Sequence, residues 1–121
     1  MKRILLAEDE EILRMLIVDT LEELDFAIDE AEDGEEALHF SEKNQYDLII
    51  VDYMMPVYTG LEVIEKVRED GVNKNTKILM LSAKNQQYEQ EKVIGAGAEY
   101  FMSKPFSPIE LIEKVEEILN G

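Results

Sequence analysis

The sequence has no cysteine, a single histidine and no long apolar run among its 121 residues. Without cysteine, the chain can form no disulfide framework and carry out no thiol chemistry. None of its apolar stretches is long enough to span a bilayer, and the charged start, Met1–Arg3, precedes an apolar run too short for a signal peptide. The one histidine, His39, falls within a predicted helix, where we expect a surface or packing role. These absences predict a cytoplasmic protein that has no membrane partner.

Basic residues are also scarce, with 12 lysines and arginines against 28 aspartates and glutamates and a formal net charge of −16. This balance argues against direct binding to a nucleic-acid backbone, which requires a basic surface. Most of the acids are expected to lie on solvated helix faces, where they favour solubility. The length and the 45% hydrophobic content suit one folded domain over residues 1–121.

Short apolar runs alternate along the chain with longer amphipathic stretches. The runs are typical of strands and cover residues 4–7, 26–31, 48–51, 78–81 and 100–103. The stretches have apolar residues at helical spacing and predict helices over residues 12–24, 33–40, 59–67, 88–94 and 107–119. Capping residues are expected at the helix starts Asp33, Thr59 and Ser107. This alternation predicts a parallel sheet with helices on both faces and right-handed crossovers.

The apolar stripes of the helices indicate which residues form the core. In the last helix we expect Ile109, Ile112 and Val115 to be mostly buried. The methionines are expected to fill gaps in the core, except Met54, which should project beside the end of the third strand.

The carboxyl ends of four predicted strands are followed by side chains that can do chemistry. Glu8 and Asp9 follow the first strand, Asp52 the third, Ser82 the fourth and Lys104 the last. Because open α/β sheets bind ligands beyond the carboxyl ends of their strands, we expect these groups to converge. Clustered carboxylates at a wet rim raise a pKa or recruit a hard cation, for which Mg²⁺ is the best fit. With a lysine and a hydroxyl, they provide the parts needed for phosphoryl transfer to an aspartate.

Five segments together resemble the receiver domain of two-component response regulators. They are Ile4–Glu10, Asp47–Pro56, Thr59–Gly60, Leu81–Ala83 and Gly97–Phe106. Each segment is weak evidence by itself, but all occur in family order and at family spacing over essentially the whole chain. The resemblance implies an α/β, flavodoxin-like (βα)5 fold, which is a doubly wound, five-stranded parallel sheet with strand order 2-1-3-4-5 and helices on both faces.

The resemblance also implies a role for each residue of the predicted site. Asp52 would accept a phosphoryl group and become an acyl phosphate. Asp9, Asp52 and the backbone carbonyl of Met54 would bind Mg²⁺ directly, and Glu8 would help to hold the ion through water. Lys104 would pair with the phosphoryl group.

Further positions would transmit or tune the signal. Ser82 would move toward a phosphoryl oxygen, and Phe101 occupies the place of the family's switch aromatic. Met54 and Lys84 occupy positions that modulate dephosphorylation in the family. The bond between Lys104 and Pro105 would be cis, as it is in the family.

Three features depart from the usual family pattern. The first acid is Glu8, where aspartate is commoner. Phe101 lacks a hydroxyl, so any switching would act through packing rather than through a tyrosine hydrogen bond. Val57–Thr59 replaces the more usual glycine and aspartate in the loop after the proline.

The leading hypothesis is a phosphorylation-activated signalling module and not an enzyme acting on other molecules. Its partners would be a sensor histidine kinase or a histidine phosphotransfer protein, and a downstream effector protein or fused output domain. The partner face would comprise the fourth helix, fifth strand and fifth helix, with residues among Lys84–Lys92 and Tyr100 as candidates, and a phosphorylation-dependent homodimer is a further option.

Several alternatives stay open. A stand-alone phosphorelay intermediate or a phosphorylation-independent binding module would use the same fold. A phosphatase of another α/β family would need a second acid near Asp52, where Met54 stands instead. A flavodoxin-like electron carrier would need a phosphate-binding loop after the first strand, where Glu8–Glu10 would repel a phosphate in the absence of a metal.

Overall fold

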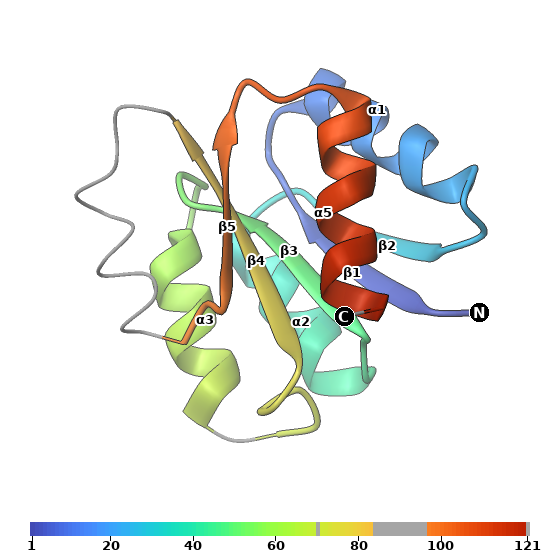
Figure 1. Ribbon diagram of the computed structural model, residues 1–121. Coiled ribbons are helices and arrows are strands. Elements are labelled where there is room, and N and C mark those ends of the chain that lie inside the picture. The colour runs from blue at the N-terminus through green and yellow to red at the C-terminus, as the bar shows by residue number, and fades with distance from the viewer. Residues whose placement is uncertain (70, 84–96, 121) are drawn as a thin grey trace.

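The computed structural model describes residues 1–69, 71–83 and 97–120, in which strands and helices alternate along most of the chain (Figure 1). The strands are β1 (Arg3–Ala7), β2 (Ala27–Ala31), β3 (Leu48–Asp52), β4 (Lys77–Ala83) and β5 (Tyr100–Lys104). The helices are α1 (Glu11–Glu22), α2 (Gly34–Lys43), α3 (Gly60–Glu69) and α5 (Pro108–Asn120). The helix predicted over residues 88–94 lies outside the described residues. No helix in the described ranges is long and apolar enough to cross a membrane.

The five strands form one parallel sheet in the order β2-β1-β3-β4-β5, which confirms the predicted topology. Ala7 pairs with Val51 across β1 and β3, so the residues that follow β1 lie beside Asp52 at the end of β3. The chain leaves β1 toward β2 on one side and leaves β3 toward β4 on the other. Open α/β sheets bind their ligands beyond the carboxyl ends of the strands at such a point of divergence, which here lies beyond β1 and β3.

The sheet is covered on both faces (Figure 1). On one face α2 and α3 pack against alternate strand residues, and on the other face α1 and α5 pack against the remaining ones. Every residue of β3 is buried, as expected for a central strand of a parallel sheet. The two core layers therefore fix the position at which Asp52 leaves the sheet.

The predicted helix starts are confirmed by their capping hydrogen bonds. Asp33 accepts a hydrogen bond from the backbone of Glu36 at 2.8 Å. Thr59 and Glu62 form a reciprocal capping box at the start of α3, with hydrogen bonds of 3.0 and 3.2 Å. Ser107 caps α5 in the same way, with Pro108 as its first helical residue.

Two predictions about the core are wrong. Ile109 is 67% exposed, because it lies about 200° around the helix from the buried Leu111. Met15 is 55% exposed for the same reason, since it stands two positions before the buried Ile17 in α1. Both side chains therefore lie on the surface, near the end of the molecule at which their helices begin.

Candidate functional site

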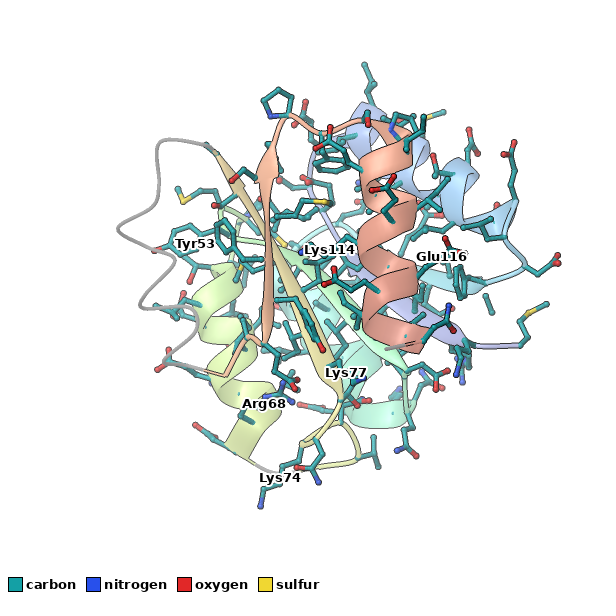
Figure 2. The ribbon with its side chains drawn as sticks, in the orientation of Figure 1. Tyr53, Arg68, Lys74, Lys77, Lys114 and Glu116 are labelled. Carbon is teal, nitrogen blue, oxygen red and sulfur yellow. The ribbon has the colours of Figure 1, made fainter. Side chains whose placement is uncertain are left out.

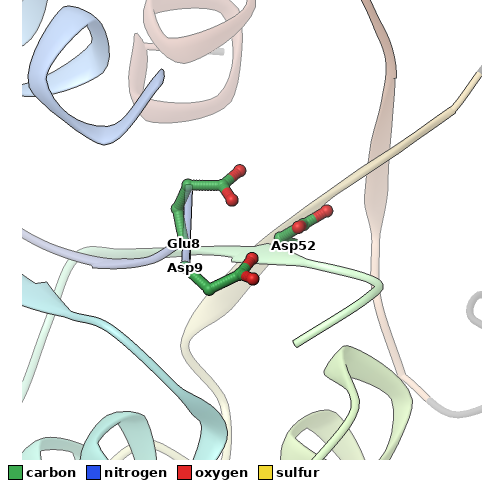
Figure 3. A group of neighbouring side chains, drawn as sticks. All are labelled: Glu8, Asp9 and Asp52. Carbon is green, nitrogen blue, oxygen red and sulfur yellow. The ribbon is translucent and has the colours of Figure 1, made fainter. Parts of the chain in front are cut away.

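The three predicted acids meet beyond the ends of β1 and β3. Figure 3 shows the carboxylate groups of Glu8, Asp9 and Asp52 turned toward the same space. One carboxylate oxygen from each residue lies within 4.8 Å of the others. Glu8 and Asp52 are buried, whereas Asp9 is exposed, so the cluster has one side open to water.

Lys104 brings a positive charge from β5 into this cluster. Its Nζ lies 2.9 Å from Oε1 of Glu8 and 3.0 Å from Oδ1 of Asp52. The bond between Lys104 and Pro105 is cis, which confirms the expectation drawn from the family. The lysine therefore bridges the two buried acids, leaving the third carboxylate without a direct ion pair to it in the described contacts.

The pKa values of the buried groups reflect the excess of acids over cations at this site. Burial raises the pKa of Glu8 to about 7, and the charge of Asp52 acts in the same direction against the hydrogen bonds from the Glu10 amide and Lys104. Burial also raises the pKa of Asp52, although Lys104 opposes this shift. Burial lowers the pKa of Lys104, but the two acids outweigh it and the net pKa is raised. The site thus favours binding of additional positive charge.

The donor set fits a hard divalent cation. It consists of carboxylate oxygens alone, it is open to water on the side of Asp9, and it combines the charges of three acids with one lysine. Mg²⁺ binds through one or two carboxylates and keeps several waters, which such a rim allows. The acidic cluster could therefore hold a metal ion.

The other predicted residues that the structure describes lie on β4, on β5 and directly after β3. Ser82 is buried near the end of β4, and its Oγ donates a long hydrogen bond of 3.5 Å to the carbonyl of Ala83. Phe101 of β5 is partly buried and packs against the core beneath α2 and α3. Met54 follows β3 and is 58% exposed. Lys84 lies outside the described residues.

The loop that follows Asp52 is held tightly against the sheet. The amide of Tyr53 donates to the carbonyl of Leu81 at 2.8 Å, and the amide of Gly60 donates to the carbonyl of Tyr53 at 2.8 Å. A Cβ atom at position 60 would overlap the carbonyl of Asp52, so this close approach requires glycine. The start of α3 thereby fixes the backbone of the candidate nucleophile.

Val57 in this loop adopts a left-handed backbone conformation, with φ of 71°. This conformation is a genuine outlier for a β-branched residue, and the side chain is 62% exposed, so little packing offsets it. We expect Val57→Gly to raise the free energy of unfolding by about 1 kcal/mol. Urea denaturation would measure the change.

Val72→Gly is the matched control, because Val72 is also an exposed loop valine but has no positive φ. This variant should be destabilised slightly through the entropy of glycine in the unfolded chain. Equal losses of stability in the two variants would show that Val57 stores no strain.

Arg14 is a further residue at this site, and none of the sequence motifs identifies it. This residue of α1 is only 8% exposed, and its Nη1 donates to the backbone carbonyl of Glu8 at 2.9 Å. Its position in the sequence predicts burial, because Arg14, Ile17 and Leu21 are spaced to lie on one face of a helix, and all three are buried. A basic residue within an apolar stripe indicates a specific buried partner.

Comparison with known proteins agrees with this geometry. The family model of the response regulator receiver domain matches residues 4–116. The transcriptional regulatory protein ResD of Bacillus subtilis is 40% identical over 118 residues, which cover 98% of this chain and 48% of ResD. The alkaline phosphatase synthesis transcriptional regulatory protein PhoP of the same organism is 38% identical, with 98% and 49% covered. The chain thus spans about half the length of these curated relatives.

Solved structures show the same fold. The chemotaxis response regulator CheY4 of Vibrio cholerae matches with a TM-score of 0.93 and 33% identity, covering 98% of this chain and 99% of that one. The receiver domain of the sensor histidine kinase PA1611 from Pseudomonas aeruginosa matches with a TM-score of 0.90 and 27% identity, covering 99% and 98%. That structure has a magnesium ion coordinated in its active site cleft. The chain described here belongs to the receiver domain family of two-component response regulators.

Proposed function

We propose that this chain is a phosphorylation-activated signalling module in which Asp52 accepts the phosphoryl group. The observation that carries the proposal is the placement of a buried carboxylate 3.0 Å from a lysine and within 4.8 Å of two further acids, at the carboxyl edge of the sheet. The fixed backbone around Asp52 supports this role, because a positioned nucleophile loses little entropy on reaction.

In the proposed reaction, a carboxylate oxygen of Asp52 attacks the phosphorus atom of a phosphohistidine. The new O–P bond forms as the P–N bond breaks, and the bonding electron pair leaves with the histidine nitrogen. Lys104 is placed to pair with an oxygen of the transferring group, since its Nζ already contacts Asp52. Ser82 would donate a hydrogen bond to another oxygen once its long bond to Ala83 is exchanged.

Asp9, Asp52 and the Met54 carbonyl would hold Mg²⁺, with Glu8 assisting. When bound, this ion would neutralise charge that develops on the phosphoryl oxygens. The support from this chain is the oxygen-only donor set and the excess of carboxylates over cations. Asp9 also keeps the site accessible to water, which Mg²⁺ retains in its coordination shell.

The exposed apolar residues suggest where a phosphoryl donor docks. Large apolar side chains between 55% and 81% exposed follow the carboxyl ends of three strands: Ile12, Met15, Met54, Val57 and Ile109. Exposed apolar groups around a polar site are typical of a protein contact surface. We therefore propose a sensor histidine kinase or a histidine phosphotransfer protein as the partner at this end.

In this proposal, Phe101 and Ser82 transmit the phosphorylation state to the surface that binds the downstream partner. Both lie on strands that end at the site, and Phe101 is only partly buried, so it has room to change its packing. Phosphorylation would bias this aromatic residue and thereby a surface that includes β5 and α5. A downstream effector, a fused output domain or a second copy would read that surface through a difference in affinity for the two states.

Phosphorylation by a small donor tests the proposal. The intact mass should rise by one phosphoryl group after incubation with acetyl phosphate and Mg²⁺, because the site supplies the nucleophile and the electrostatic stabilisation. Asp52→Asn or a chelator should abolish the gain. If wild type gains no phosphoryl group, its binding of beryllofluoride, a mimic of the phosphoryl group, should be measured. Binding would show that the pocket is intact, and no binding would indicate a phosphorylation-independent module.

A further inference from the structure

Arg14 takes no part in the proposed reaction. Its charged side chain is nevertheless buried, with only 8% of the residue exposed. A buried arginine is costly unless its donors are satisfied. Nη1 donates to the carbonyl of Glu8 at 2.9 Å, Nε donates to Glu30 at 3.3 Å, and Nη2 lies 3.5 Å from Glu32. All three guanidinium nitrogens therefore have partners, and these partners lie on two different segments of the chain.

The partner that follows β1 is the backbone carbonyl of Glu8. The carbonyl of Glu8 belongs to the peptide that joins Glu8 to Asp9, so it lies between two of the three clustered acids. The preceding peptide is still held by β2, because the amide of Glu8 donates to the carbonyl of Ala31 at 3.1 Å. Beyond that point β1 has ended, and Arg14 supplies the next fixed contact.

We infer that Arg14 is a positioning residue for the divalent cation site, which acts by fixing the Glu8–Asp9 peptide so that both carboxylates face Asp52. The inference rests on the proposed function, because it presupposes that the acids bind Mg²⁺. The planar guanidinium group makes contacts in three directions, which an ammonium group on a flexible stem does not reproduce. Glu30 and Glu32 hold the guanidinium from the side of β2, so the peptide is tied to the edge strand.

Charge and geometry predict opposite effects when Arg14 is replaced. If the residue acted only through its charge, Arg14→Gln would remove a cation near the site and tighten Mg²⁺ binding. If it positions the peptide, the same variant releases the two ligands and weakens binding. Outer contacts that orient metal ligands typically contribute about 10- to 100-fold in affinity. The sign of the change therefore separates the two explanations.

The experiment is a titration of the chelator-treated protein with MgCl₂, followed through the NMR amide signals of Asp9 and Tyr53. We expect Arg14→Gln to weaken Mg²⁺ binding about tenfold and Arg14→Lys, which keeps the charge, to weaken it about threefold or more. Circular dichroism would establish that each variant is folded. Should Arg14→Gln fail to fold, Arg14→Lys carries the test alone, because it keeps the charge and changes only the geometry of the contacts.

Arg68→Gln is the matched control. Arg68 is likewise mostly buried and donates to backbone carbonyls, those of Gly97 at 2.8 Å and Thr76 at 2.6 Å, but it lies near the amino ends of the strands (Figure 2). It should lose stability while its Mg²⁺ affinity stays at the wild-type value. Wild-type affinity, or tighter binding, in folded Arg14→Gln would overturn the inference alone. A wild-type chain that binds no Mg²⁺ would overturn the proposed metal site, and the inference with it.

Discussion

Lys104→Met is expected to lower the rate at which acetyl phosphate phosphorylates Asp52 by about 10²–10³-fold. Among the described residues, Lys104 is the only cation in ion-pair contact with Asp52. The methionine keeps most of the apolar stem but removes the ammonium group that would stabilise the transferring phosphoryl group. Intact mass measured over time at fixed Mg²⁺ concentration gives the rate.

Lys114→Met provides the control for this substitution. Lys114 pairs with Glu117 on the surface of α5, away from the acids, so its loss should leave the rate unchanged (Figure 2). A Lys104→Met variant that reacts within threefold of wild type would contradict the role assigned to the lysine.

In the absence of Mg²⁺, the protein should become less stable as the pH rises from about 5 to 8. The folded-state pKa of Glu8 is about 7, above its ordinary value of 4.5, so the folded protein binds more protons than the unfolded chain between these values. Stability therefore falls with rising pH in this window, by about 2–3 kcal/mol for Glu8. The raised pKa of Asp52 acts in the same direction.

Glu8→Gln mimics the protonated acid and should remove most of this pH dependence. We expect the variant to be more stable than wild type at pH 8 and nearly equal to it at pH 5, measured by urea denaturation with a chelator present. Glu65→Gln, an exposed substitution on α3, should follow the wild-type curve. The assignment of this pH dependence to Glu8 would be refuted if the stability of wild type rose between pH 5 and 8 more steeply than that of Glu8→Gln.

Added Mg²⁺ should reverse the loss above pH 7, because a ligand that binds only the folded state stabilises it by mass action. This result would identify the destabilising acids as the metal ligands. It would also show that the clustered acids, which repel one another, destabilise the metal-free protein and are retained for metal binding.

The sequence was sufficient to predict the fold because its local signals agree with one another. β3 is a continuous apolar run, its burial is complete, and Asp52 follows directly from its end. The capping residues Thr59 and Ser107 mark helix starts that the structure places within a residue. Parallel strands with such short connections leave few topologies, so the convergence of Glu8, Asp9, Asp52 and Lys104 followed from their positions after the strands.

Other features depend on partners that the sequence does not specify. The main partner of Arg14 is a backbone carbonyl, which every residue has, so no residue type in the sequence indicates this contact. Ile109 is as apolar as a core residue, and its exposure follows from the burial of Leu111, two positions later on α5, which the structure shows. The positive φ of Val57 arises from the path of the loop between Asp52 and Gly60, where valine carries no turn signal.

Identification of the phosphorylated residue tests the central claim most directly. After reaction with acetyl phosphate and Mg²⁺, borohydride reduces an acyl phosphate to an alcohol, which converts the modified aspartate to homoserine. Peptide mass spectrometry should then find homoserine at position 52 and an unmodified side chain at Asp9. Homoserine at another position, or a phosphoryl group on Ser82 in place of Asp52, would contradict the proposed function.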